Sequence, residues 1–240
     1  MKTILLPIVK KLVIYIAKKL WSIKDHIKLA LLCNIKYRKT PIRLSISYLY
    51  KIKLDNKYLL VKSHRIPDQF QPVGGVYKTK KGANKIFHEL KVLSDDGYAY
   101  DNDLKDDLRV RVPGKNVMNF LSWFKSNTDR EIDPQREFRE ELLDTKILTP
   151  RKAFESIDYN FLERNISKLH FSNHFQCPEI LIKDIYEFIP NEKQEQILRK
   201  IFNKETDYYR WFEQDEIISL GRTKEKKEFR VGEHTLDILY

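Results

Sequence analysis

Three glutamates lie close together on one predicted helix, within the stretch PQREFREELL at residues 134–143. At about 100° per residue, Glu137, Glu140, Glu141 and Asp144 share an arc of about 100° on the helix surface. Carboxylates at i, i+3 and i+4 repel one another by ~0.2–0.5 kcal/mol per pair, and no lysine offsets this along the stripe. Mg²⁺ would reverse the sign, because it binds carboxylate oxygens and leaves coordination positions for water and phosphates. The spacing leaves two interpretations open, a metal site and a solvated acidic face.

The helix that carries these glutamates has strong start signals. Asp133 is a favourable N-cap residue, and Pro134 suits the first helical position, where its missing N–H costs nothing. Phe138 and Leu142 lie together on another face that is suited to packing. The helix is therefore expected to begin at Asp133 and to pack through the face of Phe138.

Before this helix, the sequence alternates in the manner of β-strands. Even-numbered positions from 42 to 54 are apolar or aromatic, and the odd-numbered positions between them are mostly polar. Asp55 and Asn56 form a plausible turn into YLLVKSH, so a hairpin is predicted here. Gly74 and Gly75 interrupt a further strand in FQPVGGVYK, where glycine marks a bulge or a close approach to the backbone. The middle of the chain thus predicts a mixed sheet.

Residues 79–130 are interpreted as a long insertion. Its acidic segment SDDGYAYDNDLKDD does not have the spacing of a twelve-residue calcium loop, so a solvated loop is expected. LRVRVPG predicts a short strand. The following helix places four apolar side chains on one face suited to the core: Val117, Phe120, Leu121 and Phe124.

The basic character of the chain is concentrated at its start. Residues 1–40 contain ten Lys or Arg residues against the single Asp25, so they hold +9 of the formal charge of +11. Specific nucleic-acid binding by the whole protein is not expected from this distribution. Cys33 and Cys177 have no metal-ligand spacing and indicate structural thiols in a reduced, cytoplasmic setting.

Residues 1–40 also predict a basic amphipathic helical module, with a possible break near residues 22–25. Lys10 and Lys11 interrupt the apolar run, so neither a simple signal peptide nor a membrane span is expected. Two interpretations remain for the apolar face, which includes Ile27. It packs on the body or on a second copy of the chain, as in a homo-oligomer, or it lies in the headgroup region of an anionic membrane at the inner face of the cell membrane.

Other motifs carry less information. The pair His170 and His174 lacks the intervening Glu of a metalloprotease helix and is interpreted as structural or surface. Tyr209 and Trp211 could stack on a base, but a core role is favoured. The sequence contains no serine elbow, P-loop or paired Cys-x-x-Cys motif.

REFREELL resembles the core of the Nudix box, in which Arg-Glu-aliphatic-x-Glu-Glu lies on a helix. The strand with the glycine pair, and the later segments IYEFI, YRWFEQDEIISL and EHTLDIL, are similar in order to that family, over residues 45–240. The resemblance implies an α/β/α sandwich around a mixed sheet, with EHTLDIL as an end strand. It also implies hydrolysis of a nucleotide phosphoanhydride with Mg²⁺ or Mn²⁺.

Site residues follow from this resemblance. It implies that Glu137, Glu140 and Glu141 bind metal, that Glu137 and Glu141 take part in catalysis, and that Arg136 orients them by ion pairing. Gly74 and Gly75 would contact substrate. The chain departs from the box where the family has Gly, Glu and Gly, since it has Ser122, Thr128 and Leu143. Glu131 and Asp129 are candidates to replace the missing acid.

The expanded pattern, with QPVGGVYK, DLRV and LSWFKSNTDREIDPQREFREEL after an apolar, basic N-terminus, resembles the SMODS-associated Nudix family of CBASS anti-phage systems. Residues 41–240 would form the Nudix-like domain. The resemblance implies an effector hydrolase regulated by a cyclic oligonucleotide. The alternative is a Nudix-fold module that senses a nucleotide without turnover and acts through its N-terminal helix at a membrane or partner.

Overall fold

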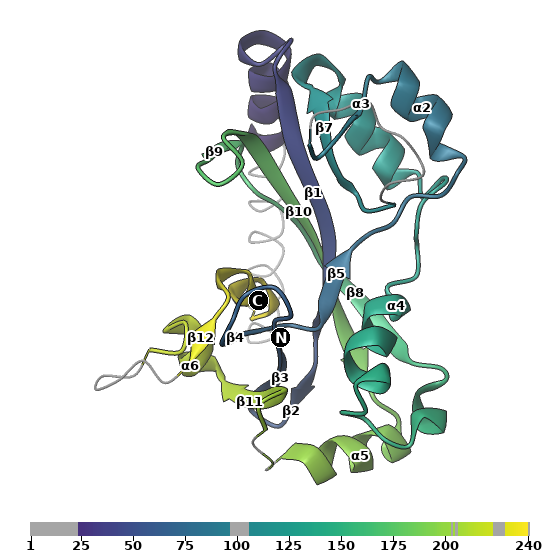
Figure 1. Cartoon of the computed structure of the whole chain (residues 1–240), viewed down its shortest axis with the longest axis vertical. Helices are drawn as coiled ribbons and strands as arrows, with labels where there is room; N and C mark the ends of the chain where they lie inside the picture. Colours follow the sequence, from purple (N-terminus) through teal and green to yellow (C-terminus); the bar gives the residue numbers. More distant parts are fainter. Residues whose placement is uncertain (1–23, 97–105, 203, 205, 223–228, 240) are drawn as a thin grey trace, which may run out of the picture.

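Two mixed β-sheets form the centre of the molecule, with helices packed beside them (Figure 1). The computed structural model describes residues 24–96, 106–202, 204, 206–222 and 229–239. The predicted mixed α/β architecture is confirmed.

The larger sheet is built around β1 (Pro41–Lys51), because this strand has neighbours on both sides. It runs parallel to β10 (Cys177–Ile189) and antiparallel to β7 (Arg109–Pro113). Four further strands complete the sheet: β5 (Gly74–Val76), β6 (Leu93–Ser94), β8 (Asp158–Ile166) and β9 (His170–Ser172). The parallel pair lies at the centre, where both faces of a sheet are most readily covered.

The smaller sheet has the strand order β11-β3-β4-β12, with β2 paired to β3. Its strands are β2 (Lys53–Leu54), β3 (Lys57–Lys62), β4 (Gln69–Gln71), β11 (Tyr209–Glu213) and β12 (Arg230–Val231). Trp211 and Tyr209 on β11 are both 6% exposed, which is in line with the core role favoured for them. The two sheets are joined by the chain that leaves β1.

The helical segments are short. The regular helices are α2 (Ala83–Glu89), α3 (Gly114–Lys125), α4 (Gln135–Phe138), α5 (Glu192–Phe202) and α6 (Gln214–Ile218). The segments with other helical geometry are η1 (Leu32–Lys36), η2 (Arg139–Asp144), η3 (Arg151–Phe154) and η4 (Glu233–Ile238).

The predicted hairpin is present, and it connects the two sheets. Its turn is at Asp55, which has a positive φ of 52°, and the flanking strands are β2 and β3. The long alternating segment does not stay in one sheet, however. It leaves the larger sheet after Lys51, and the fully buried Ile52 marks the passage into the smaller one.

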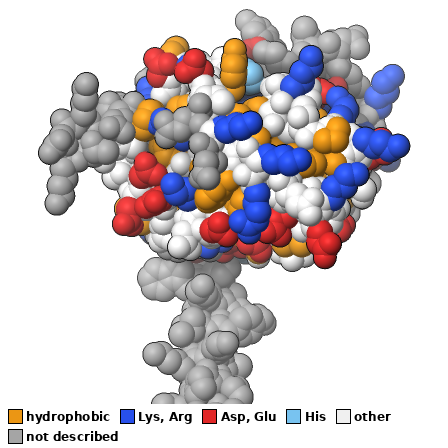
Figure 2. All heavy atoms as spheres, turned by 90° about the horizontal axis from the view of Figure 1, so that it is seen from below, with side chains coloured by type: hydrophobic (Ala, Val, Ile, Leu, Met, Phe, Trp, Pro, Cys, Tyr) orange, Lys and Arg blue, Asp and Glu red, His pale blue; other side chains and the backbone are white. Residues whose placement is uncertain are grey.

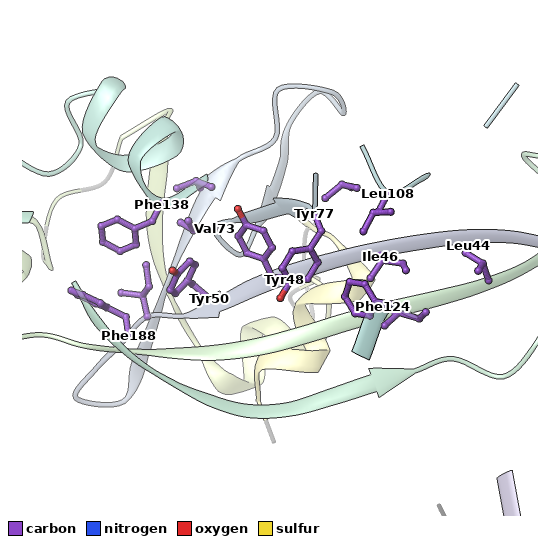
Figure 3. Close-up of a cluster of buried hydrophobic side chains, with 14 of the residues drawn as sticks. Leu44, Ile46, Tyr48, Tyr50, Val73, Tyr77, Leu108, Phe124, Phe138 and Phe188 are labelled. Carbon is purple, nitrogen blue, oxygen red and sulfur yellow. The ribbon is translucent and has the colours of Figure 1, made fainter. Parts of the chain in front are cut away.

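Alternate residues of β1 point into one core (Figure 3). Leu44, Ile46, Tyr48 and Tyr50 are all fully buried. The ring of Phe138 packs edge-on against Tyr50, with 5.5 Å between centroids. Burial of one such side chain contributes about 1.5–3 kcal/mol. The prediction that the glutamate helix packs through Phe138 is therefore confirmed, and this contact fixes the helix to the central strand.

The predicted elements at 108–127 are confirmed. LRVRVPG supplies β7, which pairs with β1 as an inner strand of the larger sheet. Helix α3 follows at once, and its predicted core side chains are all buried: Val117, Phe120, Leu121 and Phe124. Most of the acidic segment lies at 97–105, outside the described residues.

The described part of the N-terminal module is a helix, formed by residues 24–31 and continued by η1. It packs on α3 through Leu29 and Cys33, and a side chain added at Gly114 would meet the Cys33 carbonyl oxygen at 2.5 Å. Ile27 of the predicted apolar face does not pack on the body, since it is 54% exposed, and its contact with a second copy or with a membrane stays a prediction. Residues 1–23, including the first half of the break predicted near residues 22–25, fall outside the part described, while residues 24 and 25 are helical. Across the described helices, none has the length and apolarity that a bilayer crossing needs.

The segment EHTLDIL is not an end strand. Residues Glu233–Ile238 form the 3₁₀-helix η4, in which Thr235 and Ile238 are fully buried. Their spacing of three matches the period of a 3₁₀-helix, so both side chains face the interior on one edge. The resemblance to the family's strand order was misleading here.

Charged side chains of both signs cover the lower end of the molecule, where α5 lies (Figure 2). Lysine and arginine side chains are interspersed there with acidic and hydrophobic ones. This is the pattern of an ordinary solvated face.

Candidate active site

The glutamate helix α4 begins at Gln135, with Pro134 in the N-cap position, one residue later than the sequence predicts. The Gln135 N–H still donates to Asp133 Oδ1 at 2.9 Å, so the Asp133 carboxylate caps the first turn. Helix α4 then changes into the π-helix η2 from Arg139 to Asp144. The wider turn of a π-helix means that the 100° step no longer applies after Phe138.

Asp144 is set apart from two of the three glutamates. It forms an ion pair with Arg151 and does not line the cavity that Glu137, Glu140 and Glu141 share, although it lines a neighbouring cavity together with Glu140. The predicted four-carboxylate arc is therefore wrong in this one member. π-turns inside α-helices are frequent at functional sites.

The glycine pair lies directly against the glutamates. A side chain added at Gly75 would meet Glu137 Oε1 at 1.9 Å, so only glycine admits this carboxylate. The Gly74 N–H donates to Glu141 Oε2 at 2.9 Å. The prediction of a close approach at this strand is confirmed, and the groups that approach are Glu137 and Glu141. Whether the glycines also contact substrate stays a prediction.

Arg136 holds the carboxylates together. Its Nη1 atom lies 2.6 Å from Glu137 Oε1 and 3.3 Å from Glu140 Oε2. Its Nη2 atom donates to the Val76 carbonyl oxygen at 2.9 Å, which fixes the guanidinium to β5. The ion pairing that the resemblance implies for Arg136 is present, and it offsets part of the repulsion on a stripe that has no lysine.

Of the two acids proposed to replace the one missing from the box, Glu131 is the one that contacts Arg136. Glu131 Oε1 accepts from Arg136 Nε at 3.0 Å, five residues before it along the chain. Glu131 Oε2 also accepts the Lys78 N–H at 3.0 Å. The other candidate, Asp129, lies against Gly82 instead. Glu131 is therefore the residue that partners the arginine.

Burial sets the protonation of two glutamates. It raises the pKa of Glu141 to about 8, although the hydrogen bond from Gly74 opposes this shift. It also raises the pKa of Glu137, against the opposing charge of Arg136. Glu140 is half exposed at 52%. The three carboxylates thus have unequal environments, and Glu141 gains most from a nearby cation.

All three glutamates line one wall of a cavity of about 1130 Å³. Both sheets contribute to it, because residues of β1, β5 and β4 share the lining with segments near the C-terminus. Four arginines line it besides Arg136: Arg65, Arg109, Arg222 and Arg230. Burial lowers the pKa of Arg109, and the neighbouring Arg65 guanidinium lowers it further. Two cations that repel one another beside a carboxylate wall favour an anionic ligand that also carries a metal ion.

The family model for the SMODS-associated NUDIX domain matches residues 41–239. The chain belongs to this family. Among curated proteins no match is found. The family supports a Nudix-type effector in an antiviral context, and Nudix enzymes generally use divalent metals.

The donor chemistry of this NUDIX domain fits a hard divalent cation. Carboxylate oxygens of Glu137, Glu140 and Glu141 are the ligands that Mg²⁺ and Mn²⁺ prefer. Within the residues the structure describes, no three such side chains are already arranged around one ion position. Arg136 contacts one oxygen of each of two carboxylates, Glu137 Oε1 and Glu140 Oε2, so it competes with an ion for those two atoms and leaves the second oxygen of each carboxylate to the ion.

A second cavity, of about 640 Å³, adjoins the first in this NUDIX domain. Arg136 and Glu140 line both cavities and so stand between them. The second is also lined by Lys80, Arg139 and Arg151, by Lys78, which borders both cavities, and by the carboxylates of Glu131, Asp133 and Asp144. A ligand in the second cavity would therefore contact the residues that organise the first.

Several residues that line the cavity could not be predicted from a sequence motif. Gln69 and His234 are 165 positions apart and belong to no motif. Arg109 offered a partial signal, because it alternates with the buried Val110 in LRVRV and so faces away from the core. Only the folded chain brings these residues beside the glutamates.

Proposed function

We propose that this NUDIX domain is a divalent-metal-dependent hydrolase of a nucleotide phosphoanhydride, an anti-phage effector regulated by a cyclic oligonucleotide. One observation carries the proposal. Glu137, Glu140 and Glu141 line a cavity whose other lining includes Arg65 and Arg109. This arrangement suits a polyphosphate that meets a metal ion at one end and guanidinium groups along its length.

The residues of the site have different roles in this chemistry. A bound Mg²⁺ or Mn²⁺ would neutralise charge on the phosphates and lower the pKa of its water. Glu137 and Glu140 supply oxygen ligands, and Arg136 orients them from its anchor on Glu131. Glu141 is 8% exposed and holds its carboxyl against the Gly74 N–H. Once deprotonated, it is placed to bind the ion or to take a proton from the attacking water.

Nucleotide turnover tests the proposal. A panel of nucleotides with Mg²⁺ is expected to yield phosphate or a nucleoside monophosphate. Glu141→Gln is expected to lower this rate by at least about 100-fold. It should leave the melting temperature intact, because the new amide oxygen can still accept from Gly74. Asp144→Asn is the matched control, since it removes a carboxylate of the same helix outside the cavity. Equal activity of wild type and Glu141→Gln would refute the assignment.

A sensing role without turnover is the second candidate. The contacts of Arg136 with Glu137 and Glu140 favour it, because they oppose ion binding in this arrangement. Nucleotide binding with no product under the same conditions would support the sensor over the enzyme.

The second cavity is a candidate place for the regulatory ligand. Its five lysine and arginine side chains outnumber its four carboxylates by one, and they offer the phosphates of a cyclic oligonucleotide several donors. Lys80→Glu and Arg139→Glu are expected to abolish activation and to leave unstimulated turnover in place. Activation that persists in both variants would place the regulator elsewhere.

The N-terminal helix supports a proposal of contact with an anionic membrane surface. Ile27, Leu31 and Ile35 recur every four residues and are 54%, 54% and 74% exposed. Lys24 and Lys28 lie on the same helix. An exposed apolar stripe beside lysines suits the headgroup region of anionic lipid.

A further inference from the structure

Two polar side chains meet at one point of the cavity lining, above the backbone of Gly232. A side chain added at Gly232 would lie 2.6 Å from His234 Cε1 and 2.9 Å from Gln69 Nε2. The backbone there has φ −65° and ψ 137°, which any residue can adopt. The glycine thus leaves space where Gln69 and His234 face a shared volume, and all three line the cavity of the glutamates.

The side-chain amide of Gln69 forms no hydrogen bond within the part of the chain that the structure describes. Gln69 is nevertheless only 4% exposed. Its backbone is already satisfied, because the carbonyl accepts from Ser63 and the N–H donates to Ile66. The amide therefore faces the cavity, where a ligand that pairs with it gains a hydrogen bond.

His234 presents a second uncharged hydrogen-bonding group. Burial lowers its pKa to about 4, and Lys183 adds to the effect while Asp237 opposes it. The imidazole is therefore neutral at physiological pH and offers one donor and one acceptor. Gln69 offers the same pair. An anion would gain little from two neutral groups, and it has the guanidinium of Arg65, and that of Arg109 beside its partner Asp107, elsewhere in the cavity.

Apolar side chains complete this part of the lining. Ile66, Leu220 and Val231 border the same cavity. Neutral donors and acceptors beside apolar surface match a flat, uncharged, heteroatom-rich group. In a nucleotide that group is the base, whose edge pairs with amide and imidazole groups.

We propose that Gln69 and His234 form the nucleobase-recognition subsite of this cavity. The proposal rests on the proposed function in one respect, that the cavity takes a nucleotide. It adds specificity-determining residues that lie outside the Nudix box.

Equilibrium binding tests the subsite without any need for turnover. The probes are AMP, GMP, CMP and UMP, compared with ribose 5-phosphate, which lacks a base; none has a phosphoanhydride to hydrolyse. In the full-length protein with Mg²⁺, at least one mononucleotide is expected to bind about 10-fold more tightly than ribose 5-phosphate. In Gln69→Leu this ratio should fall to about 2-fold or less, with the affinity for ribose 5-phosphate unchanged.

Two further variants complete the test. Gly232→Ala moves both side chains without backbone strain and is expected to lose the same preference. Gln196→Leu makes the matched substitution on the exposed face of α5 and should keep it. The melting temperature of Gln69→Leu should not fall, because its amide has no partner among the described residues. A structural role for Gln69 would instead lower the melting temperature and weaken both kinds of probe alike.

The outcomes separate the subsite from the proposed hydrolase. A base preference that survives in Gln69→Leu and in Gly232→Ala overturns the subsite, and so does a wild type with no preference for any base. Base preference that Gln69→Leu removes, together with no phosphoanhydride turnover, supports the subsite and refutes the hydrolase. Turnover that depends on Glu141 but ignores the base supports the hydrolase and refutes the subsite.

Discussion

The neutral imidazole of His234 gives this protein a predictable loss of stability in mild acid. Burial lowers the pKa of His234 from its ordinary value of 6.5 to about 4 in the folded chain. Because the folded value is depressed, the unfolded state binds the proton first as the pH falls below 6.5. Stability is therefore fully present above pH 6.5 and is lost as the pH falls toward 4.

The magnitude follows from these two pKa values. Between pH 7 and pH 5 the unfolded imidazole becomes almost fully protonated, while the folded one stays largely neutral. The difference is about 2 kcal/mol of unfolding free energy. For a chain of this size it corresponds to a fall of about 4–8 °C in melting temperature.

Denaturant unfolding at pH 7, 6 and 5 measures the effect. Other groups also titrate, so the quantity of interest is the difference in slope between wild type and His234→Asn, which cannot titrate here. His234→Asn is expected to lose about 2 kcal/mol less than wild type over this range. His64→Asn serves as the control, since it removes an exposed imidazole from the lining of the same cavity. Identical slopes in wild type and His234→Asn would refute the picture of a buried neutral imidazole.

Three further predictions concern the site and the N-terminal helix. Glu131→Gln removes the anchor of Arg136, so Mg²⁺ affinity or activity should fall by about 10-fold or more, measured by metal titration of turnover. In Gly75→Ala the new Cβ would lie 1.9 Å from Glu137 Oε1 and so displaces this carboxylate, and turnover should fall by about 100-fold in steady-state assays. Leu31→Ser should reduce co-sedimentation with anionic vesicles and leave the melting temperature unchanged, because Leu31 is 54% exposed.

Matched variants make these results specific. In Gly82→Ala the new Cβ would lie 2.1 Å from Asp129 Oδ1 and displaces that carboxylate in the same way. Both residues lie outside the cavity lining, so this variant should keep full activity. Leu162→Ser replaces a leucine on β8 that is 38% exposed and should not alter vesicle binding. If Leu31→Ser pellets as well as wild type but changes the oligomeric state, the stripe contacts a second copy of the chain. Full turnover in Gly75→Ala would show that the position of Glu137 is not critical.

Much of the local structure could be predicted because it depends on neighbours along the chain. The cap at Asp133 needs only the next few residues, and the buried face of β1 follows from strict alternation. The glycine pair predicted that another group approaches the backbone of this strand closely, since glycine within a strand leaves room for one. Family resemblance, and not periodicity, supplied the roles expected of the glutamates.

The sequence by itself determined which residues could do the chemistry, because side-chain types and helix spacing are local properties. Tertiary structure decided which of them meet. Asp144 pairs with Arg151 outside the cavity of the three glutamates, and folding brought Glu131 to Arg136 from a position that no box spacing allows. Gln69 and His234 line the same cavity as the three glutamates, because residues far apart in the chain are brought together when the two sheets pack. Such contacts depend on how whole elements pack, which short-range patterns do not encode.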